Sequence, residues 1–246
     1  MTRMDFARAF AKTDYLTVGT RRTIDIAIDA LRSTLPVGGG KIVVDVAGGK
    51  GVAGCDIATA IGTTVVIFEI YPALLADAGA RLSRLELSDR VAVVAADGNR
   101  LPLADGAVAA ATCVGGASIV GIPRVFEELA RVVRRGGLVV VSDVVWRTRP
   151  DGPLGEDWGD PPAEIQYALP EYQEVMRAAG LRPETTEQHP RSDWEDYVAP
   201  ILEVAREARA AGDTAFADEL QASFELELRW AEAYWDYVTI VARVAD

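Results

Sequence analysis

The chain has 246 residues, half of them apolar, and its 37 acidic and 25 basic side chains give a net charge of −12. This length fits one large globular domain, the composition excludes a disordered chain, and no apolar run approaches the roughly 18–20 residues that a membrane helix needs. Two cysteines and a single histidine give neither a disulfide framework nor a metal-ligand spacing, and residues 1–10 have no signal-peptide core, so we expect a cytoplasmic protein without a metal.

Up to residue 145, helical and strand patterns alternate along the chain. Helices are expected at 3–12, 21–35, 52–61, 72–85 and 124–134. Strands are expected at 41–46, 64–68, 91–95, 107–113 and 138–142. This alternation predicts an α/β fold with a doubly wound, parallel sheet and right-handed crossovers.

After residue 145 the composition changes. Residues 146–246 contain 22 of the 37 acidic residues, 9 of the 25 basic ones and all five tryptophans. The pattern predicts an irregular loop at 147–163, helices at 170–179, 194–211 and 213–233, and strands at 182–188 and 237–244. No linker or repeat sets this stretch apart, so we assign it to the same domain. Without a basic face the chain does not fit nucleic-acid binding, and its acidity is typical of a solvated surface.

A glycine-rich loop follows the first expected strand. Residues 49–54 match the pattern G-x-G-x-x-G before a helix, and Glu69 follows Gly49 by 20 residues at the end of the next strand. Glycines allow a ligand to approach the backbone, a helix N-terminus offers free N–H groups, and an acid can bind ribose hydroxyls. The combination indicates an adenosine-containing ligand, but it does not distinguish NAD from S-adenosylmethionine. A purely structural glycine turn is the alternative.

Three further features favour S-adenosylmethionine. About 40 residues precede the first strand, whereas a dinucleotide-binding dehydrogenase usually begins near it. Asp45 lies inside that strand, where a buried carboxylate must be paired, and it could orient the loop and meet the ligand's ammonium group. Asp97, at the end of the third strand, is placed to accept a hydrogen bond from an adenine amino group.

These motifs, taken in order, resemble the class I S-adenosylmethionine-dependent methyltransferases. Residues 43–51 (VVDVAGGKG) resemble the family's glycine-rich motif, and residues 129–137 (LARVVRRGG) resemble the helix and turn before its fifth strand. Residues 112–118 and 192–197 resemble a bacterial small-molecule branch. The match covers about residues 15–145 well and the remainder loosely. It implies a Rossmann-like, mostly parallel seven-stranded sheet whose last strand is antiparallel, with a helical cover.

The resemblance also implies a set of cofactor-binding residues, with Glu69 on the ribose and Asp97–Gly98 at the adenine. The set comprises Tyr15, Thr20, Asp45, Ala47, Gly48, Gly49, Gly51, Glu69, Ile70, Asp97, Gly98 and Cys113. Tyr15 and Thr20 belong to the N-terminal stretch that often covers the cofactor in this family. Two positions depart from the family pattern: Ala47 replaces the first loop glycine, and the fourth strand begins without the usual aromatic–Asp pair. Cys113 also reads as a small buried packing residue.

The acceptor is expected at the carboxyl ends of the parallel strands, beneath segments 146–169 and 190–235. Trp146, Tyr167 and Trp194 are the expected acceptor-pocket residues, and the alternative is that the tryptophans fill a core or form a dimer contact. His189 and Asp143 are candidates for removing the acceptor's proton. A surface histidine and a capping acid are the competing interpretations of these two residues.

The sequence therefore predicts a class I methyltransferase that methylates an O, N or C atom of a small molecule, in specialised metabolism. Its three parts are an N-terminal helical cap (1–36), a cofactor-binding core (37–145) and an acceptor-side cover with the last strands (146–246). A homodimer is possible. An NAD-dependent oxidoreductase and a non-catalytic cofactor-binding protein of the same fold are the alternatives.

Overall fold

The structure is a computed structural model, and it describes residues 3–35, 41–152, 154–155 and 158–245. Its strands are β1 (Ile42–Val46), β2 (Thr64–Glu69), β3 (Val91–Ala95), β4 (Val108–Val114), β5 (Val133–Trp146), β6 (Leu181–Gln188) and β7 (Trp235–Val244). Its helices are α1 (Arg3–Ala9), α2 (Thr20–Thr34), α3 (Val52–Ile61), α4 (Pro72–Arg84), α5 (Ala117–Val120), α6 (Arg124–Val132), α7 (Leu169–Ala178), α8 (Arg191–Ala210) and α9 (Thr214–Ala233).

All seven strands form one sheet in the order β3-β2-β1-β4-β5-β7-β6. Strands β1 to β5 run parallel to one another, and β7 runs antiparallel to both β5 and β6. The predicted fold class is confirmed, including the antiparallel last strand. Because β7 lies between β5 and β6, the C-terminal strands complete the same sheet that the cofactor-binding core begins.

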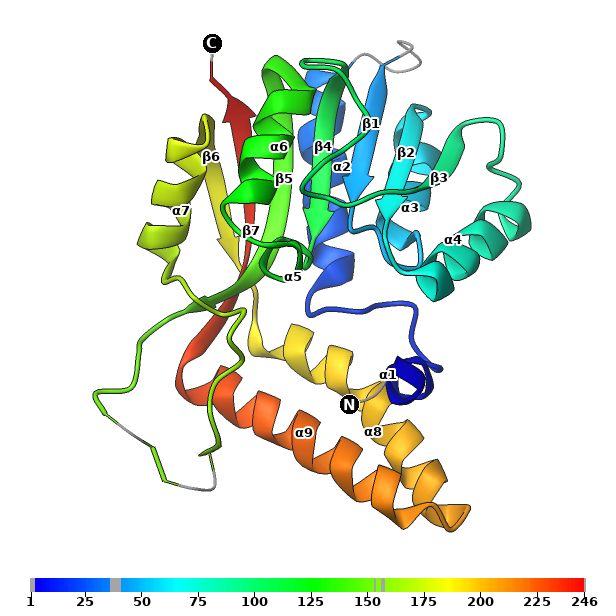
Figure 1. The fold of residues 1–246 in the computed structure, drawn as a ribbon, viewed down its shortest axis with the longest axis vertical. Coiled ribbons are helices and arrows are strands. Elements are labelled where there is room, and N and C mark those ends of the chain that lie inside the picture. Colours follow the sequence, from blue (N-terminus) through cyan, green and yellow to red (C-terminus); the bar gives the residue numbers. More distant parts are fainter. Residues whose placement is uncertain (1–2, 36–40, 153, 156–157, 246) are drawn as a thin grey trace.

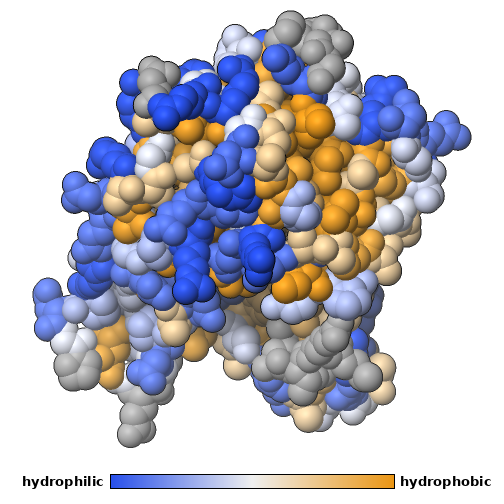
Figure 2. All heavy atoms as spheres, turned by 45° about the horizontal axis from the view of Figure 1, so that its top comes forward, coloured by the Kyte–Doolittle hydropathy of each residue, from blue (hydrophilic) through white to orange (hydrophobic). Residues whose placement is uncertain are grey.

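The apolar strands pack against helices through two buried clusters on opposite faces of the sheet. One cluster joins the sheet to α6 and α7 and includes Phe126 and Tyr172. The other joins the sheet to α2 and α3 and includes Ile24 and Ile57. The β3–β4 connection has no helix, and Figure 2 shows apolar residues gathered on the side of the molecule where β1–β3 lie. Ile42, at the start of β1, is 39% exposed.

Most observed bounds lie within about three residues of the prediction, and two elements differ more. β5 is longer than the expected 138–142, because antiparallel pairing with β7 continues as far as Trp146 opposite Trp235. The short helix α5 follows directly after the turn at Gly115–Gly116, and the sequence reasoning assigned no element there. Its four residues are too few to give a helical repeat of apolar positions.

A cover of helices lies at the carboxyl edge of the parallel strands, which is the lower edge of the sheet in Figure 1. The helices α1, α8 and α9 form this cover, and the chain between α1 and α2 runs along the same edge below β1 and β2. α8 and α9 pack antiparallel through buried residues such as Ile201 and Phe224. Within the described residues, no helix is long and apolar enough to cross a membrane.

Candidate active site

The loops that leave β1, β2, β3 and β4 meet at the covered edge of the sheet. After β1 the chain forms the predicted glycine loop, in which the amide of Gly51 donates to the carbonyl of Gly48 at 2.9 Å. Ala47, Gly49 and Gly51 all have positive φ, of 54°, 56° and 75°. Glycine adopts this left-handed backbone without penalty, whereas Ala47 bears a cost of about 1–2 kcal/mol where the family has glycine.

The neighbours of this loop show why it needs small residues. A Cβ atom at Gly48 would lie 2.5 Å from Cγ2 of Ile67, and one at Gly116 would lie 2.6 Å from Cβ of Ala47. A Cβ atom at Gly49 would lie 2.9 Å from Cδ1 of Leu16. The backbone of the loop is therefore closely approached by side chains on several sides, which explains its small residues.

Asp45 anchors the loop from within β1. Its side chain is fully buried, and it accepts hydrogen bonds from the hydroxyl of Thr112 at 2.7 Å and from the amide of Gly54 at 3.1 Å. Burial raises the pKa of Asp45 to about 6, against the opposing effect of these donors. Asp45 thus ties β1 to β4 and to the first turn of α3, and it reaches any cofactor only through the loop that it holds.

Glu69 ends β2 beside the glycine loop. Its Oε2 accepts a hydrogen bond from the amide of Gly49 at 2.9 Å, and its Oε1 accepts from the amides of Ile70 and Tyr71 at 2.7 and 2.9 Å. A carboxylate oxygen has two lone pairs, so Oε2 keeps one that can accept from a hydroxyl group. The predicted ribose acid and the glycine loop form one connected unit.

The residues that the resemblance places at the adenine lie next to this unit, and Asp97 and Ile70 among them are open to solvent. Asp97 is exposed, and only its Oδ1 is engaged, by the amide of Asn99 at 2.9 Å. Gly98 is buried, and a Cβ atom there would lie 2.9 Å from Cγ1 of Val46. Ile70 is 56% exposed and offers an apolar surface beside Glu69. An acid, a small residue and an exposed apolar side chain together fit the edge and face of a purine ring.

A strap formed by residues 13–19 lies over the glycine loop. The ammonium group of Lys50, inside the loop, donates to the carbonyls of Phe10 and Thr13 at 2.8 Å each. Arg81 on α4 pairs with Asp14 at 2.5 Å. The loop and its neighbouring helix therefore hold the strap directly.

The two predicted residues of the N-terminal stretch take different positions in it. Tyr15 is half-buried and packs against the α2–α3 cluster. Thr20 begins α2, and its hydroxyl donates to the carbonyl of Thr17 at 2.8 Å. The hydroxyl of Thr20 thus shapes the end of the strap.

The turn after β4 is joined to the strap through Tyr237. The hydroxyl of Tyr237 lies 2.9 Å from Oγ of Ser142 and accepts a hydrogen bond from the hydroxyl of Thr17 at 3.1 Å. The amide of Gly115 donates to the same Ser142 Oγ at 3.2 Å. Burial raises the pKa of Tyr237, so its hydroxyl stays neutral. The sequence reasoning did not identify Tyr237, because an aromatic residue in a buried strand ordinarily indicates core.

Cys113 and Asp143 lie on the face of β4 and β5 that is opposite to Ser142. Cys113 is fully buried, and burial raises the pKa of its thiol, so the thiol is packed and neutral. The Asp143 carboxylate accepts hydrogen bonds from the amide and hydroxyl of Ser118, both at 2.8 Å. It also accepts from the amide of Val144 at 2.9 Å and the hydroxyl of Tyr172 at 3.4 Å. Burial raises the pKa of Asp143 to about 6. Asp143 thus holds α5 in place after the β4 turn.

Both ring nitrogens of His189 are engaged. Nδ1 lies 2.9 Å from Oδ2 of Asp193, and Nε2 lies 2.7 Å from the hydroxyl of Thr239. Burial lowers the pKa of His189, which keeps the ring neutral near pH 7. These contacts give His189 a place in the packing between β6, β7 and α8. Its predicted role as a proton acceptor, like that of Asp143, stays a prediction.

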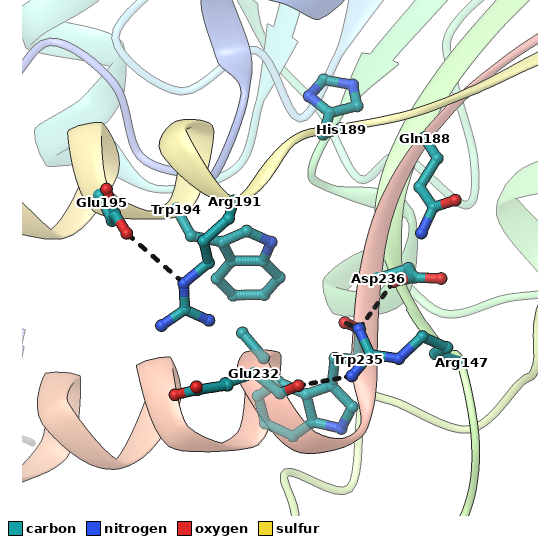
Figure 3. A pocket seen from close by; sticks show the side chains of 10 residues that line it. Arg147, Gln188, His189, Arg191, Trp194, Glu195, Glu232, Trp235 and Asp236 are labelled. Carbon is teal, nitrogen blue, oxygen red and sulfur yellow. Dashed lines mark hydrogen bonds and ion pairs between the residues drawn. The ribbon is translucent and has the colours of Figure 1, made fainter.

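A cavity of about 510 Å³ lies between the end of β6, the start of α8 and the end of α9 (Figure 3). The indoles of Trp194 and Trp235 form part of its wall, and His189 also lines it. The charged groups around it pair with one another: Arg147 with Asp236 at 3.1 Å, and Arg191 with Glu195 at 3.8 Å. The cavity thus brings together His189 and Trp194, two residues that the sequence placed on the acceptor side.

The tryptophans pack mainly against each other. Trp146 is 6% exposed, its ring lies 6.0 Å from Trp230 and 6.1 Å from Trp235, and its indole N–H donates to the carbonyl of Ile165 at 2.8 Å. Trp194 stacks on Trp235 at 6.5 Å. Tyr167 is half-buried near Tyr172 at a ring distance of 6.5 Å. This packing supports the interpretation of Trp146 as core, whereas Trp194 belongs both to the cluster and to the cavity wall.

Comparison with known proteins agrees with this geometry. Residues 43–137 match the family model of a methyltransferase domain. The chain is 26% identical over 234 residues to the 27-O-demethylrifamycin SV methyltransferase of Amycolatopsis mediterranei, covering 89% of this chain and 82% of the relative. It is also 35% identical over 115 residues to the demethylmenaquinone methyltransferase of Mycolicibacterium paratuberculosis, which is 46% of each chain.

Solved structures show the same fold. A SAM-dependent methyltransferase from Geobacter sulfurreducens, in complex with S-adenosyl-L-homocysteine, superposes with a TM-score of 0.78 at 23% identity, over 99% of this chain and 98% of that one. Residues 43–137 therefore have the sequence of a methyltransferase domain, and the whole chain shares its fold with an S-adenosylmethionine-dependent methyltransferase. The domain match favours a methyltransferase over an NAD-dependent oxidoreductase.

Proposed function

We propose that this methyltransferase moves a methyl group from S-adenosylmethionine to an O, N or C atom of a small organic acceptor that lies between the carboxyl edge of the sheet and the helical cover. The observation that carries the proposal is the convergence of the glycine loop, Glu69 and the β4 turn under one strap. The match to the rifamycin relative supports it, because that match extends beyond the methyltransferase domain into the cover. Specialised metabolism is the setting that this relative suggests.

The residues present fit the cofactor. Glu69 can accept from ribose hydroxyls through its remaining lone pair, and the exposed carboxylate of Asp97 can accept from the adenine amino group. Ile70 can pack on the purine face. The glycine loop provides backbone without side chains at the point of closest approach. We propose the same roles for these residues that the sequence resemblance implies.

The bound cofactor supplies a methyl group on a positively charged sulfur, which an acceptor atom can attack in line. The protein's part is to hold the acceptor at this point and to exclude water. The Thr17–Tyr237–Ser142 contacts fix the strap against the β4 turn, so closing the strap and shaping the acceptor space are linked. Because His189 and Asp143 are fully hydrogen-bonded, we propose that they position α8 and α5 unless a bound acceptor displaces their partners.

The test is a methyl-transfer screen. Purified protein is incubated with S-adenosylmethionine carrying a deuterated methyl group and with fractionated bacterial small molecules, proteins and RNA. The proposal predicts labelled methyl in the small-molecule fraction, together with S-adenosylhomocysteine formation, and loss of both in Gly51→Val. Label that appears only in the protein or RNA fraction would contradict it.

A further inference from the structure

Glu227 lies on the inward stripe of α9. The buried residues of this helix include Leu220, Phe224 and Ala231. Glu227 follows Phe224 by three positions and precedes Ala231 by four, so helical spacing places it on the same face. Its side chain is only half-buried, although its neighbours along the stripe are buried. A carboxylate among such residues carries a desolvation cost unless a partner compensates it.

The carboxylate of Glu227 has no such partner. In the part of the chain that the structure describes, no hydrogen bond or ion pair joins it to another residue, whereas the exposed Glu225 accepts from Nε2 of Gln221 at 2.7 Å. Burial alone raises the pKa of Glu227, to about 7. The side chain is thus largely surrounded by protein and still keeps accessible surface, so that a ligand can reach it.

The neighbours of Glu227 are aromatic. Phe224, one helical turn before Glu227, packs against Tyr197 on α8, and burial, followed by the charge of Glu227, raises the pKa of Tyr197. The ring of Tyr197 lies 6.2 Å from Phe10 and 6.1 Å from Phe224. Trp194, one helical turn before Tyr197 on α8, lies at a ring distance of 6.3 Å from Tyr237, so this group of residues lies toward the β4 turn. Aromatic faces and one uncompensated carboxylate therefore lie together on the inner side of the cover.

The cavity of Figure 3 offers a contrast. Of its three acidic residues, Asp236 pairs with Arg147 and Glu195 pairs with Arg191, and the third, Glu232, is exposed to solvent. Glu227 is not among the residues that line it. The uncompensated charge lies instead on the side of α8 and α9 that carries Tyr197.

We propose that Glu227 binds a protonated amine of the acceptor, so that this enzyme methylates small molecules that carry a basic nitrogen. A cation compensates a partly desolvated carboxylate better than a hydroxyl group does, and the partly exposed ring of Tyr197 adds attraction for a cation. The inference rests on the proposed function, since it concerns the acceptor of the same site. It leaves open whether the amine itself or another atom of the acceptor receives the methyl group.

The test uses pairs of probes that differ only in the ammonium group. Protein saturated with S-adenosylhomocysteine is titrated calorimetrically with benzylamine and benzyl alcohol, and with 2-phenylethylamine and 2-phenylethanol. The wild type should bind at least one amine tenfold or more tightly than its alcohol. Glu227→Gln should abolish the preference and keep its affinity for S-adenosylhomocysteine, and Glu225→Gln, which removes an exposed charge from the same helix, should keep the preference.

Equal affinities for amine and alcohol in the wild type, or a preference that persists in Glu227→Gln, would overturn the assignment of Glu227. Affinity for S-adenosylhomocysteine reports separately on the proposed function, because it is measured first and without an acceptor. Glu227→Gln replaces a desolvated carboxyl with a neutral isostere, so we expect it to fold. Should Glu227→Gln not fold, Tyr197→Leu provides the second variant, and it should weaken the amine more than the alcohol; an equal loss for both would overturn the proposal.

Discussion

The backbone amide of Gly49 donates a hydrogen bond of 2.9 Å to Oε2 of Glu69, 20 residues further along the chain. This contact joins the glycine loop after β1 to the acid that ends β2. The glycine loop and Glu69, the two parts of the predicted cofactor motif, are therefore held together by a direct hydrogen bond. A change at either residue should affect the other.

Glu69→Gln should lower the affinity for S-adenosylmethionine at least tenfold. The neutral amide is a weaker acceptor for ribose hydroxyls, and a hydrogen bond to a charged group contributes about 1.5–3 kcal/mol. Calorimetric titration of the variant measures the change. Asp77→Asn removes an exposed carboxylate from the neighbouring helix α4 and is the control. Equal dissociation constants in the wild type and Glu69→Gln would remove Glu69 from the cofactor site.

Gly51→Ala should weaken cofactor binding, whereas Gly62→Ala should not. Both glycines have φ near +70°, so each substitution bears a similar backbone cost of about 1–2 kcal/mol. A Cβ atom at Gly51 would lie 3.1 Å from Cβ of Ala78, but one at Gly62 meets nothing within 4 Å. Thermal unfolding and cofactor titration of the two variants separate backbone strain from displacement of the loop. Equal cofactor affinities would show that the loop tolerates a side chain.

Lys50→Met should release the strap from the glycine loop. The variant loses two hydrogen bonds to the carbonyls of Phe10 and Thr13, so amide hydrogen exchange in residues 13–19 should become faster. Lys41→Met, which removes an exposed lysine before β1, is the control. Faster exchange in both variants, or in neither, would contradict the role of Lys50.

Trp146→Ala should cost about 3–5 kcal/mol of unfolding free energy, since its ring is buried among other rings. Trp158 is only half-buried in the same cluster, and Trp158→Ala should cost less. Urea unfolding measures both. If Trp146→Ala stays stable but binds the acceptor more weakly, Trp146 lines the acceptor pocket, as the sequence predicts.

Asp143 should make stability depend on pH between about 4 and 6. Burial raises its native-state pKa from 3.8 to about 6, so the native protein holds a proton that the unfolded chain releases. The contribution is present at low pH and is lost as the pH rises through about 6. Urea unfolding at pH 5 and pH 7.5 should show the wild type losing stability relative to Asp143→Asn, by about 1–3 kcal/mol. A constant difference at the two pH values would contradict this assignment, and Asp77→Asn serves as the control.

The fold and the meeting of the glycine loop with Glu69 could be predicted because their signals are local. The helix at 52–61 and the strand at 91–95 follow from apolar patterns and flanking glycines, and the observed bounds agree. The spacing from Gly49 to Glu69 indicates that two strand ends meet, and the structure joins them directly. These features depend on short stretches of chain, in which the local sequence determines the backbone conformation.

The acceptor side could not be predicted in the same way, because its contacts join residues far apart in the sequence. Thr17 and Tyr237 meet across 220 positions, and no pattern along the chain marks the pair. His189 has the right residue type for a base, but only the structure shows that Asp193 and Thr239 engage both nitrogens. In the sequence, Glu227 resembles any other acid on a charged helix. Only the structure shows that it lies on the inward face of α9.

Binding of the cofactor by the wild-type protein tests the central claim most directly. Calorimetric titrations with S-adenosylmethionine, S-adenosylhomocysteine and NADH, at one temperature and salt concentration, decide it. The account predicts one site per chain that binds S-adenosylmethionine and S-adenosylhomocysteine at micromolar concentrations, with no heat from NADH. Micromolar binding of NADH without binding of either methionine derivative would contradict it.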